Sequence, residues 1–93
     1  MEGKVYAVLL RTCYEDYDWN TEDTAVLLGV CSTIELARMM GKNELLENFC
    51  YDEDLDIFYY GQTEAWICIW ECDIDQKLDL TKPPIETIPK QYE

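Results

Sequence analysis

The N-terminal third of the chain carries two apolar stretches separated by a polar, acidic one. Residues Lys4–Cys13 are aliphatic, aromatic or β-branched on both alternating faces, which predicts a strand in the centre of a sheet. Residues Thr24–Cys31 predict a second strand, with Val26, Leu28 and Val30 on one face. Because the two strands are neighbours in sequence, we expect an antiparallel hairpin closed by a long acidic loop.

A helix start follows directly after the second strand. The Ser32 hydroxyl is expected to accept a hydrogen bond from the Glu35 amide while the Glu35 carboxylate reaches back, as in a capping box. Gly41 leaves two alternatives, because glycine weakens a helix interior. The helix either continues to Phe49, or it ends near Lys42 and a second short helix follows. Apolar residues at helical spacing give it one apolar side: Ile34, Leu36, Ala37, Met39 and Met40.

Two further strands are predicted in the second half of the chain, at Asp56–Tyr60 and Glu64–Ile74, joined around Gly61-Gln62-Thr63. Residues 78–93 contain three prolines, which donate no backbone hydrogen bond and favour extended chain. This last segment is therefore expected to lie outside the sheet. Large and sulfur-containing side chains alternate on one face of the later strand: Trp66, Cys68, Trp70 and Cys72.

The order of these elements predicts an α+β fold. We expect a single antiparallel sheet of about four strands with one main helix packed on one face, in the order ββαββ. Residues 1–77 would form this single domain, and residues 78–93 its Pro-containing tail. One helix covers only one face, so the other face must be covered by the tail, by a second copy of the chain or by a partner.

Charge narrows the class of partner. The 93 residues carry a net charge of −13 and contain no histidine, and no basic residue occurs in residues 12–37 or 43–76. Such a chain is repelled by nucleic acid and by anionic membranes and attracted to basic surfaces. We therefore expect a basic protein partner, with no direct binding of nucleic acid or membrane.

The residue types needed for catalysis are scarce. Without histidine, the usual general base and the commonest metal ligand are missing, and no glycine-rich phosphate-binding motif occurs. We expect no enzyme activity, no catalytic residue and no cofactor. The five cysteines are odd in number and lack the paired spacing of a zinc site, which favours reduced thiols in a cytoplasmic protein. No secretory signal is visible.

Two acidic segments resemble calcium-binding loops, Asp16–Asn20 and Asp52–Asp56. Each has acids or amides at positions 1, 3 and 5, but Thr21 and Ile57 occupy position 6, where the loop requires glycine. Solvated acidic loops are the favoured interpretation, and no metal site is predicted.

The same two segments are the candidate partner-binding patches. If Asp52, Asp54 and Asp56 lie on extended chain, their carboxylates point to one side at intervals of ~6.6 Å, a scale similar to the phosphate spacing of ~3.4 Å per strand in nucleic acid. In the other patch, Tyr17 and Trp19 lie between acids and could stack on arginine side chains of a partner.

In size, composition and acid clustering over Glu15–Asp23 and Asp52–Asp56, the chain resembles small acidic phage proteins that mimic nucleic acid, including anti-CRISPR proteins. This resemblance implies an inhibitor that fills the basic nucleic-acid channel of a nuclease complex. The segments Val5–Val8, Leu28–Ala37 and Trp70–Asp75 are similar to short bacterial and phage domains of unknown function, although Cys31 replaces their aromatic residue. The second resemblance implies a fold rather than a function.

The leading hypothesis is a non-catalytic inhibitor or regulator that binds the basic, nucleic-acid-binding groove of a partner, such as a CRISPR nuclease complex, in the cytoplasm of a host cell if the protein is phage-encoded. The alternative is an intracellular scaffold or homodimer module that acts through an apolar sheet face bearing Trp66 and Trp70. The residues expected to bind the partner are Glu15, Asp16, Tyr17, Asp18, Trp19, Glu22, Asp23, Asp52, Glu53, Asp54 and Asp56.

Overall fold

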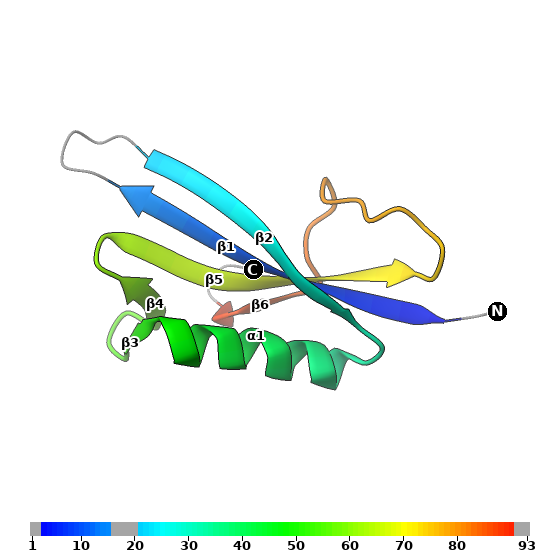
Figure 1. Cartoon of the computed structure of the whole chain (residues 1–93), viewed down its shortest axis with the longest axis horizontal. Helices are drawn as coiled ribbons and strands as arrows, with labels where there is room; N and C mark the ends of the chain where they lie inside the picture. The colour runs from blue at the N-terminus through cyan, green and yellow to red at the C-terminus, as the bar shows by residue number, and fades with distance from the viewer. Residues whose placement is uncertain (1–2, 16–20, 91–93) are drawn as a thin grey trace.

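A computed structural model describes residues 3–15 and 21–90 and has one helix and one antiparallel sheet (Figure 1). The α+β class is confirmed, but the sheet has six strands instead of about four. The two strands that the sequence pattern missed, β3 and β6, are three residues each. The elements are β1 Lys4–Glu15, β2 Thr21–Cys31, α1 Ile34–Asn48, β3 Cys50–Asp52, β4 Ile57–Tyr60, β5 Thr63–Asp73 and β6 Glu86–Ile88.

Strand β1 lies in the centre of the sheet, as its two apolar faces predicted. The strand order is β2-β1-β5-β4-β3, and β6 pairs with β5 beyond the short β4. The β1–β2 hairpin is confirmed, but the strands extend further than expected, because Tyr14 pairs with Glu22 and Glu15 with Thr21. The predicted loop over residues 14–23 was therefore too long at both ends.

A β-bulge changes the faces of β2. Val8 lies opposite Gly29 and Leu9 opposite Leu27, so Leu28 is an extra residue in its strand. Directly opposed residues share a face, and Val30 lies opposite Ala7 whereas Val26 lies opposite Leu10. The prediction that Val26, Leu28 and Val30 share one face was therefore wrong.

Helix α1 runs unbroken from Ile34 to Asn48. Its N-cap is Thr33, whose hydroxyl accepts from the Leu36 amide at 3.2 Å, so the predicted Ser32 cap was one residue too early. Gly41 is tolerated inside the helix because the helix packs closely on the sheet there. A Cβ atom at Gly41 would lie 2.7 Å from Cγ2 of Ile67.

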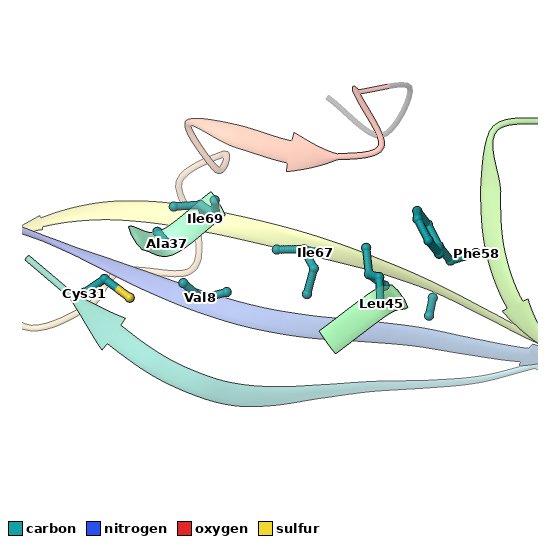
Figure 2. Packing of buried hydrophobic residues seen from close by; sticks show 8 residues of the cluster. Val8, Cys31, Ala37, Leu45, Phe58, Ile67 and Ile69 are labelled. Atoms are coloured by element: carbon teal, nitrogen blue, oxygen red, sulfur yellow. The ribbon is translucent and has the colours of Figure 1, made fainter. Parts of the chain in front are cut away.

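The main core lies between α1 and the sheet. Val8 on β1 and Ile67 and Ile69 on β5 are fully buried against the helix residues Ala37 and Leu45. Figure 2 shows these side chains between the strands and the helix, with Phe58 at one end of the cluster and Cys31 at the other.

The opposite face of the sheet is covered by the C-terminal segment. The side chains of Trp66, Cys68, Trp70 and Cys72 share this face, as predicted, and Trp70 is only 5% exposed. The Trp70 indole Nε1 donates a hydrogen bond to the Lys82 carbonyl at 2.8 Å. The sequence analysis left open whether the tail, a second copy of the chain or a partner covers this face, and in the structure the tail lies over it at Trp70.

The tail also contributes to the sheet. β6 pairs antiparallel with β5, and Cys68 lies opposite Thr87. The expectation that the Pro-containing segment forms no ladder hydrogen bonds was wrong, because the prolines at 84 and 89 flank β6 and leave its own amide groups free to pair.

Candidate functional site

The two acid-rich segments lie toward the same end of the long axis, but Asp23 on β2 and Asp52 on β3 are on opposite edges of the sheet (Figure 1). Because β1 and β5 are antiparallel, the end of β1 lies beside the β4–β5 turn: Tyr14 lies opposite Thr63, and the Glu15 amide donates to the Gln62 carbonyl at 3.4 Å. Strands β3 and β4 and their turn lie toward the same end of the long axis (Figure 1). We call this region the acidic end and define it by Glu15, Glu22, Asp23, Asp52, Glu53, Asp54, Asp56 and Glu64.

In the second patch, the expected straight row of carboxylates is absent. Asp52 pairs with Ile57 across a tight turn, and the Asp52 Oδ1 atom accepts from the amides of Asp54 (3.0 Å) and Leu55 (3.1 Å). Asp56 has a φ of 53°, a conformation that aspartate tolerates better than most residues. The condition of an extended chain is not met, because the segment reverses direction, and this turn agrees with the interpretation of Asp52–Asp56 as an acidic loop.

The carboxylates that the turn leaves available for a partner are not the row of Asp52, Asp54 and Asp56 that an extended chain would present. The Tyr51 hydroxyl donates to Asp56 Oδ1 at 2.6 Å, and this hydrogen bond raises the pKa of Tyr51. Asp52 is engaged with the backbone. Glu53 and Asp54 are exposed at the tip of the turn. These two are therefore the residues of the patch best placed to meet a partner.

In the first patch, the described acids lie on strands. Glu22 lies opposite Tyr14 and Asp23 opposite Cys13, so these two acids project from opposite faces of the hairpin. A hydrogen bond from the Cys13 thiol to Asp23 raises the pKa of the thiol, with smaller contributions from desolvation and nearby carboxylates. The predicted residues Asp16, Tyr17, Asp18 and Trp19 lie outside the described residues.

Basic residues neutralise acids elsewhere on the molecule. Lys4, at the other end of β1, forms salt bridges with Asp73 at 2.7 Å and Glu71 at 3.5 Å. Arg38 pairs with Glu86 at 2.7 Å, between α1 and β6. Among residues 3–15 and 21–90, no salt bridge involves the acidic-end carboxylates Glu15, Glu22, Asp23, Asp52, Glu53, Asp54 or Glu64. The region therefore carries a net negative charge.

Exposed tyrosines accompany these acids. Tyr60 is 70% exposed at the β4–β5 turn, Tyr51 is 46% exposed on β3, and Tyr14 and Tyr59 are also exposed. The sequence analysis singled out Tyr17 and Trp19 and missed Tyr51, Tyr59 and Tyr60. A usable signal was present, since Tyr59 and Tyr60 directly precede a turn within a base-free window. Tyrosine beside carboxylate suits recognition of arginine on a partner.

Other kinds of site are not evident in the part of the chain that the structure describes. No group of three or more cysteine, aspartate or glutamate side chains is arranged to hold a metal ion. No helix there has the length and apolar character of a membrane span. All five cysteines are free thiols.

Comparison of the chain with protein-family models, with curated proteins and with solved structures gives no match. The function of the acidic end therefore has to be inferred from its own geometry and charge.

Proposed function

We propose that the protein is a non-catalytic inhibitor or regulator whose acidic end binds a basic, nucleic-acid-binding groove of a partner protein, in the manner of an anti-CRISPR nucleic-acid mimic. The observation that carries the proposal is the gathering of Glu15 and Asp23 from one base-free window with Glu64 from the other around Cys13, where none of these three forms a salt bridge with a described residue. A groove built for phosphates presents lysine and arginine, which carboxylates can satisfy with charge-assisted hydrogen bonds.

The tip of the β3–β4 turn and the exposed tyrosines suit this role. Glu53 and Asp54 lie on a turn that is held by its own hydrogen bonds, so little conformational freedom is lost when a partner binds. Tyr60 supplies an exposed ring at the other end of β4, beside the end of β1. We expect the acids to set the association rate and the specificity, and the tyrosines to contribute contact area.

The test is affinity capture from a bacterial lysate, with the tagged protein as bait at low salt and at about 0.5 M salt. The expected result is one or a few basic, nucleic-acid-binding proteins that are retained at low salt and released at high salt. Retention that is unchanged between the two salt concentrations would contradict the proposal.

A matched pair of variants locates the surface. Glu53→Gln with Asp54→Asn removes two charges from the acidic end, and Glu71→Gln with Asp75→Asn removes two charges of the same types from the region around the end of β5. The first pair should weaken capture of the partner roughly tenfold, and the second should change it little. Equal effects of the two pairs would mean that total charge matters and the acidic end does not.

The alternative is a homodimer module, but on the sheet face of Trp66 and Trp70 that it was expected to use, Trp70 is buried beneath the tail. A different surface supports self-association. Strand β2 is an edge strand of the described sheet, and Val26, Leu27 and Val30 are each more than half exposed on it. Antiparallel pairing of two β2 strands would place Glu22 and Asp23 of the two copies at opposite ends of the contact.

Salt separates the two proposals. Self-association through β2 would strengthen as salt screens the mutual repulsion of two chains of net charge −13, whereas binding through the acidic end would weaken. Sedimentation equilibrium at low salt and at about 0.5 M salt measures the sign of the effect for self-association.

A further inference from the structure

Three of the seven basic residues of this acidic chain line one cleft. Arg38 and Lys42 on α1 and Lys90 after β6 surround a cavity of about 380 Å³ between the helix and the C-terminal segment. The helix residues are four positions apart and therefore lie on the same side of α1. The cleft is separate from the acidic end, and the proposed function does not use it.

The walls of the cleft are held by specific contacts. The Arg38 Nε atom donates to Glu86 Oε2 at 2.7 Å, which ties the helix to β6 through one nitrogen of the guanidinium group. Thr87 is 1% exposed, and its hydroxyl donates to the Pro89 carbonyl at 2.9 Å. This hydrogen bond fixes the turn that precedes Lys90. The cleft is thus built from a rigid helix and a pinned segment.

The local charge is opposite to that of the whole chain. Three cations line the cleft and Glu86 is the one acidic residue among the described residues that line it. Neither Lys42 nor Lys90 forms a salt bridge with a described residue, in contrast to Lys4, which has two carboxylate partners. The cleft therefore has unused capacity to bind negative charge.

We propose that this cleft binds a small molecule bearing phosphate groups. The guanidinium group and two ammonium groups are the donors that recognise phosphate oxygens, and the volume is at the lower end of small-molecule sites. A nucleic-acid strand is disfavoured, because its further phosphates would meet the acidic surface of the remaining chain.

The experiment is a titration of the ¹⁵N-labelled protein with inorganic phosphate and with pyrophosphate, followed by ¹H–¹⁵N correlation spectra at constant ionic strength. The expected result is saturable shifts at Arg38, Lys42 and the amides of Thr87, Ile88 and Lys90, with pyrophosphate the tighter ligand. Shifts that do not saturate, or that spread over all basic residues, would overturn the proposal.

Charge variants test the assignment in both directions. Lys42→Gln with Lys90→Gln should weaken pyrophosphate binding roughly tenfold, whereas the control Lys77→Gln with Lys82→Gln should leave it unchanged. Glu86→Gln should tighten binding, because it removes the carboxylate that competes for Arg38. Thermal unfolding without phosphate checks that each variant is folded, and Lys90→Gln alone replaces the double variant if that one is not.

Three further outcomes would contradict the site: an equal loss in the control variant, weaker binding by Glu86→Gln, or a single-stranded oligonucleotide that binds more tightly than pyrophosphate. The last of these would assign the cleft to nucleic acid. None of these results depends on capture of a protein partner, so the cleft and the acidic end can fail separately.

Discussion

The two faces of the sheet are both buried at their centres, but by different means. On one face, Val8, Ile67 and Ile69 are fully buried beneath a regular 15-residue helix. On the other face, Cys68 and Trp70 are 3% and 5% exposed beneath an irregular segment, and the Trp70 indole donates a hydrogen bond to the Lys82 carbonyl of that segment. The helix contacts several strands at once, whereas the tail follows β5.

This difference predicts two kinds of opening. Removing the helix from the sheet would expose the largest buried cluster, so it should coincide with global unfolding. Removing the tail exposes a smaller cluster and leaves the main core in place, so it should occur as a local event of lower free energy. Each face contains one buried cysteine, Cys31 under the helix and Cys68 under the tail, which makes the two openings measurable.

The largest expected effect is on the helix face. Leu45→Ala removes a fully buried side chain and should lower the free energy of unfolding by about 3 kcal/mol. The matched control is Leu46→Ala, at a position that is 62% exposed, and it should change stability by less than about 0.5 kcal/mol. Urea denaturation followed by circular dichroism measures both. Similar losses at the two positions would contradict the packing of α1.

A second effect concerns the close approach of α1 to β5. At a solvent-exposed helix position, replacing glycine with alanine stabilises the helix. In Gly41→Ala, however, the added Cβ would lie 2.7 Å from the buried Ile67 side chain. We expect a net loss of about 1–2 kcal/mol in the free energy of unfolding. Lys42→Ala, the exposed neighbour, serves as the control in the same urea titration. A stabilised Gly41→Ala protein would show that the helix can move away from the sheet.

On the tail face the expected effect is smaller and local. Trp70→Phe removes the hydrogen bond to the Lys82 carbonyl and should cost about 1 kcal/mol. The measurement is the rate of thiol labelling in a protein that keeps only Cys31 and Cys68, with the other three cysteines replaced by serine. The two rates report how often each face of the sheet opens. Cys68 should react faster in the variant and Cys31 should not. Equal acceleration at both cysteines would mean that the two faces open together.

The smallest expected effect is on the reactivity of Cys13, which lies near the end of β1 on the same face of the sheet as Trp66. Asp23→Asn removes the main cause of the raised pKa of Cys13, so more of the thiol is ionised at a given pH. Alkylation of a variant that retains only Cys13 should become roughly two- to threefold faster at pH 8. Glu22→Gln, whose side chain lies on the other face of the hairpin, is the control. A slower reaction in Asp23→Asn would contradict the hydrogen bond.

Sequence patterns predicted the long strands and the helix, but not the exact helix cap or the short strand β6. An apolar run identified β1, alternating large side chains identified β5, and helical spacing identified α1. The choice between Ser32 and Thr33 as the cap depends on where the preceding strand ends. Cys31 pairs with Tyr6, so Ser32 is needed to leave the sheet and Thr33 becomes the cap. β6 was missed because it forms only where the short β4 leaves the edge of β5 open.

The candidate site was predictable in composition and only in part in geometry. The acids were evident from the base-free windows, but the approach of Glu64 to the end of the β1–β2 hairpin depends on the pairing of β1 with β5, which are distant in sequence. The turn at Asp52–Asp56 agrees with the interpretation of this segment as an acidic loop, although alternating acids are compatible with either a strand or a turn. The basic cleft joins Arg38 and Lys42 with Lys90 by the same kind of long-range contact.

The central position of β1 has a consequence for biosynthesis. Lys4 lies opposite Asp73 and Tyr14 opposite Thr63, so one of the two neighbours of β1 is translated long after β1 itself. Until then the nascent β1–β2 hairpin has an unpaired inner edge and an apolar surface, which are the features that chaperones bind and that promote aggregation. Formation of the sheet on the ribosome is therefore expected to wait until β5 has left the exit tunnel.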